Sequence, residues 1–117
     1  MSFNDTEIKV VQWAEARQII PNSTPMAQAI KTLEEVTELL TAIHRGDKAE
    51  MRDAYGDILV TLIVGAALAD MDIKQCLGEA YETIKNRRGY LREDGVFIKQ
   101  ESSWVGHYHD PNPIKQE

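Results

Sequence analysis

Seven acidic side chains crowd one short stretch of the sequence. Residues 34–57 carry seven Asp and Glu against three Lys and Arg, in a chain whose formal net charge is −6. Two carboxylates about 6 Å apart repel each other by roughly 3 kcal/mol at an effective dielectric constant near 20. A converging group of such side chains therefore needs either water or a cation. Carboxylates without His or Cys partners suit a hard ion, Mg²⁺ or Mn²⁺.

The spacing of these acids places them on two helix faces. The first set is Glu34, Glu35 and Glu38, and the second is Glu50, Asp53 and Asp57. At about 100° per residue, spacings of three, four and seven bring the members of each set to one side of a helix. The link between the two segments is short, which predicts an antiparallel helix hairpin whose acid faces can meet. No His follows a Glu by three residues, so the ligand pattern of di-iron bundles is absent.

Each acid also has a simpler explanation. A run such as residues 34–38 is commonly a solvated helix face, and Glu50 is placed to be the capping-box partner of Asp47. Asp57 is harder to explain in this way, because it directly precedes an apolar segment and follows Gly56. A glycine inside a helix costs about 1 kcal/mol relative to alanine, which suggests that something approaches closely there.

A basic segment follows further along the chain. Residues 85–92 contain no acid and carry Lys85, Arg87, Arg88 and Arg92. Such a cluster favours phosphate binding, although the helix dipole also stabilises cations at the C-terminal end of a helix. Lys31 lies one turn before Glu34 and Glu35, so it either reaches the mouth of the same site or forms a helix salt bridge with Glu35.

Four helices are expected to position these side chains. Apolar residues at steps of three and four predict helices over residues 4–18, 25–45, 48–69 and 73–88, with a loop at 21–24. Thr24 before Pro25 is a helix start, Gly46 is a helix stop, and Asp47 caps the next helix. The buried stripe of the second helix is expected to consist of Ile30, Leu33, Val36, Leu40 and Ile43. The second half of the third helix is apolar nearly all round, and it is expected to be buried on all sides.

The predicted fold class is all-α. We expect a four-helix bundle-like subunit in which the antiparallel helix hairpin carries the acidic site. Residues 1–100 are expected to form the domain and residues 101–117 a non-helical C-terminal tail. Gly89 is expected to end the fourth helix, and residues 96–98 are expected to form either a short strand or an arm across a neighbouring subunit.

Composition sets limits on partners and location. The chain has 117 residues, of which 43% are hydrophobic, as expected for one globular domain. Its negative charge argues against a nucleic acid partner. The longest apolar run, residues 58–69, is shorter than the about 20 residues that a membrane helix needs, and the N-terminus has no signal-peptide pattern. A lone Cys76 fits a reducing compartment, so a cytoplasmic location is expected.

Three segments in this order resemble one family. Residues 28–39 (QAIKTLEEVTEL), 52–60 (RDAYGDILV) and 84–89 (IKNRRG) are similar to the MazG-like nucleotide pyrophosphohydrolases of the all-α NTP pyrophosphatase superfamily. The similarity is greatest to the short, single-domain members common in bacteriophages, and it extends over about residues 10–100. Residues 94–99 (DGVFIK) also look like the tail of these proteins.

The resemblance implies Mg²⁺-dependent hydrolysis of a nucleoside triphosphate to a nucleoside monophosphate and pyrophosphate, with Mn²⁺ able to substitute. The metal ligands would be Glu35, Glu38, Asp57 and, in place of a glutamate that relatives carry at the position of Ala54, Asp53 or Glu50. Glu34 and Glu38 would have catalytic roles, with Glu34 either a ligand or the base for the attacking water. Substrate contacts would come from Lys31, Lys85, Arg88, Gln28 and Trp13.

The resemblance further implies a homodimer or homotetramer that acts in nucleotide-pool control, in the host cytoplasm if the chain is phage-encoded. A purine such as dGTP fits this role, but nothing in the sequence fixes the base. Two alternatives stay open. One is a non-catalytic, dimeric helical interaction module whose acids are merely solvated, and the other is an enzyme that acts on phosphoribosyl-ATP.

Overall fold

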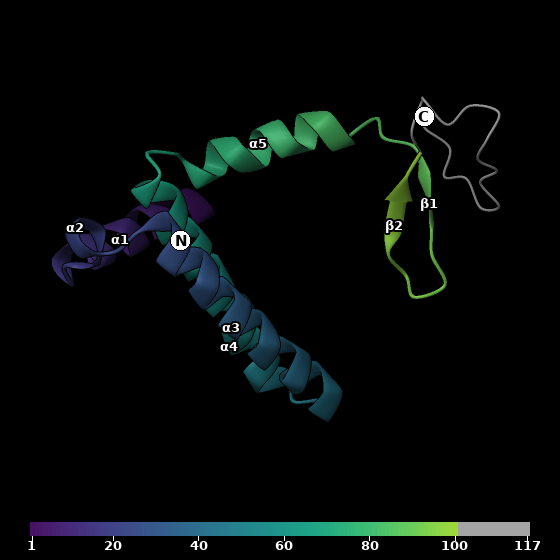
Figure 1. The fold of residues 1–117 in the computed structure, drawn as a ribbon, viewed down its shortest axis with the longest axis horizontal. Coiled ribbons are helices and arrows are strands. Elements are labelled where there is room, and N and C mark those ends of the chain that lie inside the picture. Colours follow the sequence, from purple (N-terminus) through teal and green to yellow (C-terminus); the bar gives the residue numbers. More distant parts are fainter. Residues whose placement is uncertain (101–117) are drawn as a thin grey trace. The chain divides into compact units, whose positions relative to one another are not determined.

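The computed structural model describes residues 1–100, and these residues confirm the all-α class. In chain order the elements are α1 (Phe3–Ala16), α2 (Ile19–Asn22), α3 (Pro25–Arg45), α4 (Lys48–Leu68), α5 (Ile73–Ile84), β1 (Gly89–Leu91) and β2 (Phe97–Lys99) (Figure 1). The chain divides into two compact units, Met1–Cys76 and Leu77–Glu117. Each unit is described by itself below. The predicted tail, residues 101–117, lies outside the described residues.

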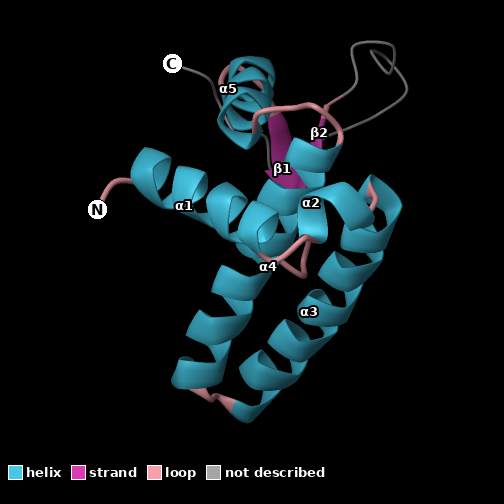
Figure 2. Ribbon diagram, turned by 90° about the vertical axis from the view of Figure 1, so that its left-hand side faces the viewer, coloured by secondary structure: helices cyan, strands magenta, loops and turns pink. Residues whose placement is uncertain are grey.

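The predicted helix hairpin is formed by α3 and α4, which lie side by side (Figure 2). The Thr24 hydroxyl accepts a hydrogen bond from the Ala27 N–H at 3.0 Å, and Pro25 occupies the first turn of α3. α3 ends at Gly46, whose φ of 68° is a left-handed conformation that glycine adopts without strain. One residue later, Asp47 Oδ1 accepts from the Glu50 N–H at 3.0 Å and begins α4. Local sequence signals therefore fix both ends of the turn.

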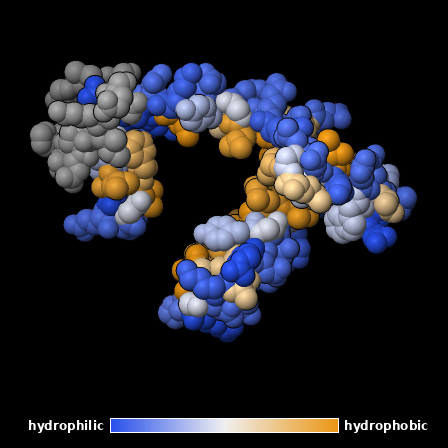
Figure 3. All heavy atoms as spheres, turned by 180° about the vertical axis from the view of Figure 1, so that it is seen from behind, coloured by the Kyte–Doolittle hydropathy of each residue, from blue (hydrophilic) through white to orange (hydrophobic). Residues whose placement is uncertain are grey.

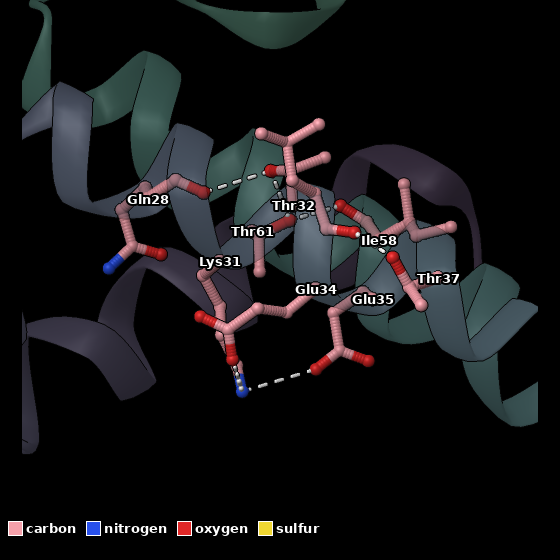
Figure 4. A network of polar contacts seen from close by, with 9 residues as sticks. Gln28, Lys31, Thr32, Glu34, Glu35, Thr37, Ile58 and Thr61 are labelled. Carbon is pink, nitrogen blue, oxygen red and sulfur yellow. Dashed lines mark hydrogen bonds and ion pairs between the residues drawn. The ribbon is translucent and has the colours of Figure 1, made fainter.

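Small and hydroxylated residues line the contact between α3 and α4. The Thr32 and Thr61 hydroxyl oxygens are 2.8 Å apart, and each also lies within hydrogen-bond distance of a carbonyl of its own helix (Figure 4). A Cβ atom added at Gly65 would lie only 3.3 Å from the Gln28 Cβ. The buried alanine on the α3 side of this contact is Ala42. Such residues allow the two helix backbones to approach closely.

The predicted buried stripe of α3 is wrong for the single chain. Ile30, Leu33 and Leu40 expose 52%, 69% and 63% of their surface, and Ile43 is also exposed; of the five predicted residues, Val36 alone is half-buried. The reason is that α4 packs against the other side of α3, where Glu35 and Ala42 are buried. The second half of α4 is likewise not buried on all sides, because Leu59 and Leu62 are exposed. The first unit therefore has exposed hydrophobic surface, which Figure 3 shows in orange.

Two predicted details of the N-terminal region are also corrected. α1 ends at Ala16 rather than residue 18, because Gln18 adopts a left-handed φ of 64° that an α-helix cannot contain. The predicted loop at residues 21–24 is partly occupied by the single-turn helix α2. The first unit is completed by α1 and α2, which both contact α4. An ion pair of 3.6 Å between Glu7 Oε1 and Lys74 Nζ joins α1 to the start of α5.

The second unit carries a β-hairpin where a longer helix was predicted. α5 ends at Ile84, not at Arg88, and β1 begins at Gly89. The two strands are antiparallel, with Tyr90 opposite Ile98, so the predicted strand at 96–98 is found one residue later. A side chain at Gly89 would clash with the Ile98 carbonyl, so glycine is needed for this pairing rather than for ending a helix. α5 has no buried residue.

One basic and one acidic side chain, Arg92 and Asp94, stabilise the turn of this hairpin. The Arg92 guanidinium donates to both carboxylate oxygens of Asp94, at 3.1 and 2.6 Å, and the Val96 N–H donates to Asp94 Oδ1 at 3.2 Å. The Arg92 hydrogen bonds, followed by the one from Val96, lower the pKa of Asp94. Gly95 completes the turn with a φ of 88°. Within residues 1–100, no helix is both long and apolar enough to cross a membrane.

Candidate active site

A cavity of about 350 Å³ opens between α3 and α4, and we call it the acidic cavity. Five carboxylates line it: Glu35, Glu38, Glu50, Asp53 and Asp57. These are the five residues that the sequence and the resemblance named as metal ligands. The remaining lining residues are Thr37, Thr41, Arg45 and Ala54. The hairpin therefore brings the predicted ligand set to one place.

The hairpin geometry explains why these side chains meet. Each helix contributes acids at spacings of three, four or seven, which keep them on one helix face. The short turn at Gly46 and Asp47 makes the two faces antiparallel neighbours. The hydroxyl contact between Thr32 and Thr61 lies about one turn from Glu35 on α3 and from Asp57 on α4, so it sets the axial position of the two acid sets.

Lys31 neutralises part of this charge from the α3 side. Its Nζ atom lies 3.4 Å from Glu35 Oε1 and 3.8 Å from Glu34 Oε1, as Figure 4 shows. The side-chain hydrogen bond to Glu35, followed by the charge of Glu34, raises the pKa of Lys31. Glu35 is buried, with 7% of its surface exposed. The ion pair therefore gives a buried carboxylate the partner that it requires.

Asp57 carries the charge that is least compensated. Burial is the first cause that raises its pKa, and the negative charges of Asp53 and then Glu35 raise it further. The positive charge of Lys31 opposes this effect but does not reverse it. A cation in the acidic cavity would remove the repulsion and favour the ionised form of Asp57.

The donor chemistry of the acidic cavity fits a hard divalent cation, because every candidate ligand is a carboxylate oxygen. The side chains do not yet converge on one point: among residues 1–100, no three His, Cys, Asp or Glu side chains are grouped closely enough to hold a metal ion. Binding would therefore require the carboxylates to rotate inward. Ala54 stands where relatives carry a glutamate. Asp53 and Glu50, the two proposed replacements for that glutamate, line the cavity together with Ala54.

Other predicted site residues lie outside the acidic cavity. Glu34 does not line it, and its side chain is 61% exposed. The Gln28 amide donates to Ser23 Oγ at 3.1 Å, and Trp13 is exposed on α1. Lys85 and Arg88 belong to the second unit, where Lys85 forms an ion pair of 2.6 Å with Glu82. The roles of these five residues stay predictions.

The structure also shows functional candidates that sequence reasoning missed. Thr41 and Arg45 continue the line of Glu38 at steps of three and four along α3, and both line the acidic cavity. The signal in the sequence is the 38–41–45 spacing, which places all three side chains on one face of a helix. Arg45 brings a second positive charge to a site that otherwise repels phosphate.

A second, larger cavity of about 710 Å³ lies between α1 and α4, and we call it the α1–α4 groove. Its α1 wall includes Glu7 and Val10. Asp53 and Asp57 line both this groove and the acidic cavity, so the two spaces are neighbours. The groove is formed by residues about 50 positions apart in the sequence, so no local sequence pattern could predict it.

Comparison with known proteins assigns the family. A model of the MazG nucleotide pyrophosphohydrolase domain matches residues 24–91. A segment of 63 residues, 54% of this chain, is 33% identical to an uncharacterized 18.2 kDa protein from the rep-hol intergenic region of Haemophilus phage HP1 (strain HP1c1), and spans 39% of that protein. No solved structure matches the chain. Since the domain model covers more than half of the residues and includes both acid-bearing helices, the chain belongs to the MazG nucleotide pyrophosphohydrolase domain family.

Proposed function

We propose that the chain is a Mg²⁺-dependent pyrophosphohydrolase that converts a nucleoside or deoxynucleoside triphosphate to the monophosphate and pyrophosphate. One observation carries this proposal: five carboxylates from α3 and α4 line a single cavity within the segment that matches the MazG domain. Mn²⁺ is expected to substitute for Mg²⁺, because both ions prefer oxygen ligands.

In this proposal, the residues in and beside the acidic cavity have different roles in the reaction. A bound divalent ion would offset the charge of the phosphates and acidify a water molecule. The water oxygen attacks the α-phosphorus, the bond from this phosphorus to the bridging oxygen breaks, and pyrophosphate leaves. Glu38 is the proposed acceptor of the water proton, since it lines the cavity and is exposed to solvent. The proposed contacts to phosphate oxygens are Arg45, which lines the cavity, and Lys31, which pairs with Glu35.

A homodimer or homotetramer is part of the proposal. Ile30, Leu33, Leu40 and Ile43 form one exposed apolar stripe on α3, opposite the side that packs on α4. Large contiguous apolar patches on a soluble protein mark interaction surfaces. A second copy of the chain would cover this stripe and leave the acidic cavity unobstructed.

The biological setting is proposed from the phage relative. That protein is itself uncharacterized, and the similarity spans less than half of its length. We propose a role in nucleotide-pool control in the cytoplasm of an infected host. Such a role needs no nucleic acid partner, in keeping with the net negative charge of the chain.

A turnover panel tests this function directly. The eight common ribo- and deoxyribonucleoside triphosphates, and phosphoribosyl-ATP, are incubated with the full chain in Mg²⁺, in Mn²⁺ or in EDTA. We expect equal amounts of monophosphate and pyrophosphate with either ion and none in EDTA. Exclusive turnover of phosphoribosyl-ATP would redirect the assignment within the enzymes. Absence of any turnover, with no change of Tm on adding Mg²⁺ and nucleotide, would overturn the proposal in favour of the interaction module.

A further inference from the structure

The α1–α4 groove is positioned to receive the part of a substrate that the acidic cavity does not hold. Asp53 and Asp57 form a shared wall between the two spaces. A nucleotide whose phosphates lie over these carboxylates would extend its nucleoside into one of the flanking spaces. The groove, at about 710 Å³, has the larger volume and lies within the usual range for small-molecule pockets.

The groove is lined mainly by apolar side chains, as expected for a site that takes up a planar base. Phe3 and Val10 contribute from α1, and Val60 and Ile63 contribute from α4. Gly56 is also part of this lining, and a Cβ added there would meet no atom of the chain within 4 Å. The space beside this glycine is therefore left open by the chain itself.

Charged side chains interrupt this lining: Arg52, Asp53 and Asp57 on α4, and Glu7 on α1. The Glu7 side chain lines the groove and is only 12% exposed, and its Oε1 atom lies 3.6 Å from Lys74 Nζ. An ionised carboxylate only accepts hydrogen bonds, and an ammonium group only donates them. On the α1 wall of the groove, Glu7 therefore presents two acceptor oxygens, with the Lys74 donor beside one of them.

This arrangement matches the Watson–Crick edge of guanine. Guanine presents two adjacent donors, N1–H and the N2 amino group, next to the O6 acceptor. The Glu7 carboxylate can accept from both donors while Lys74 donates to O6. Adenine and cytosine place a ring acceptor beside their single amino donor, and uracil and thymine place carbonyls on both sides of N3–H. Each of these bases would turn an acceptor toward the carboxylate.

We propose that the Glu7–Lys74 pair in the α1–α4 groove is the base-specificity determinant of this chain, and that it selects guanine nucleotides. The inference rests on the proposed function, because the acidic cavity must hold the phosphates of the same ligand. Glu7 and Lys74 are binding residues in this scheme and take no part in the chemical step. Every other base would turn an acceptor toward the half-buried Glu7 carboxylate and leave one of its oxygens without a donor, which is costly.

Equilibrium binding of monophosphates tests the inference without relying on turnover. dGMP, dIMP, dAMP, dCMP and dTMP are titrated into the full chain by calorimetry in Mg²⁺. Inosine lacks only the N2 amino group, so dIMP isolates one hydrogen bond to the carboxylate. We expect dGMP to bind about 10- to 100-fold more tightly than dIMP, the range for a hydrogen bond to a charged group. Glu7→Gln should reduce this ratio to near one, because the amide supplies only one acceptor.

A matched control is Glu15→Gln, since Glu15 is an exposed acid of the same helix that lines neither cavity. This variant should retain the wild-type preference. Equal binding of dGMP and dIMP by the wild type would overturn the inference, as would a preference that survives Glu7→Gln. If Glu7→Gln fails to fold, the comparison of dGMP with dIMP on the wild type still decides. If the chain binds and hydrolyses all bases equally well, this inference is overturned and the proposed function stands. If it binds guanine nucleotides selectively but hydrolyses none, the proposed function is overturned and this inference stands.

Discussion

On α3, the side that packs within the chain is more polar than the side that is exposed, which is the opposite of the usual amphipathic helix. The side against α4 carries Thr32, the buried Glu35 and the small residue Ala42. The opposite side carries Leu33 and Leu40, which are mostly exposed. In an isolated globular domain the apolar side is expected to face the core. Here the contact within the chain forms the candidate site, and the apolar side is exposed in the single chain.

Close approach of the two helices explains this division. Carboxylates from α3 and α4 can share a ligand only if the backbones lie near each other, and large Leu or Ile side chains between them would hold them apart. Gly65 and the Thr32–Thr61 contact permit the short distance. Under the proposed function, the inward side of α3 serves the reaction and the outward side serves oligomerisation, and three experiments test this assignment.

The largest effect is expected from an acid on the inward side. Glu38→Gln should lower kcat/KM by about 10²- to 10⁴-fold, because it removes the proposed proton acceptor or an ionic ligand. Glu34→Gln is the matched variant on the same helix, and its effect should be several-fold at most, since Glu34 lies outside the acidic cavity. Steady-state release of pyrophosphate measures both. Equal losses in the two variants would show that the cavity boundary does not separate catalytic from peripheral acids.

An intermediate effect is expected from the outward side. The double variant Leu33→Asp with Leu40→Asp should dissociate the oligomer, because each Asp would bury an unpaired charge in the proposed interface. Sedimentation equilibrium should then give the mass of a single chain, 13.2 kDa. The volume-conserving control, Leu33→Met with Leu40→Met, should keep the wild-type mass. A wild-type chain that is already monomeric would contradict the assignment of the stripe to a second copy.

The smallest effect concerns stability. Because the pKa of Asp57 is raised in the folded chain, the folded state binds its proton more tightly than the unfolded state does. The stabilisation from this residue is full below its unfolded pKa and is lost as pH rises through the folded pKa. Asp57→Asn should therefore raise the Tm of the metal-free protein at neutral pH by roughly 2–4 °C, while it abolishes turnover.

Differential scanning calorimetry in EDTA measures this change. The difference in Tm between Asp57→Asn and the wild type should shrink as the pH falls toward about 4, near the ordinary pKa of Asp. Glu15→Gln again provides a control at an exposed acid. A variant less stable than the wild type at neutral pH would mean that Asp57 supports the fold more than it strains it.

Local signals predicted much of the fold. The hydroxyl of Thr24, the left-handed turn at Gly46 and the carboxylate of Asp47 act on residues within one turn, so the sequence suffices to place both ends of the hairpin. The five acids that share the cavity followed from helical spacing and the short link. Such features depend on neighbours in the chain and need no knowledge of tertiary packing.

The errors arose where distant residues decide the outcome. Periodicity identified the apolar stripe of α3, but which side meets α4 depends on residues such as Thr61 and Gly65 on the other helix. The end of α5 at Ile84 follows from pairing of Tyr90 with Ile98, which competes with helix propensity only once both strands exist. The α1–α4 groove likewise needs two helices that are far apart in sequence.

The Thr32–Thr61 hydroxyl pair has a consequence for how the chain tolerates change. Two hydroxyl protons are shared among three oxygen contacts, so the bridge forms when one threonine donates across it, and either threonine can be that donor. A slip of one helix along the other by a single residue is about 1.5 Å, three times the roughly 0.5 Å within which positioned groups work well. This uncharged bridge, which does not line the acidic cavity, thus fixes the position of α3 along α4. Loss of either hydroxyl would remove this bridge between the two acid-bearing helices without altering any carboxylate.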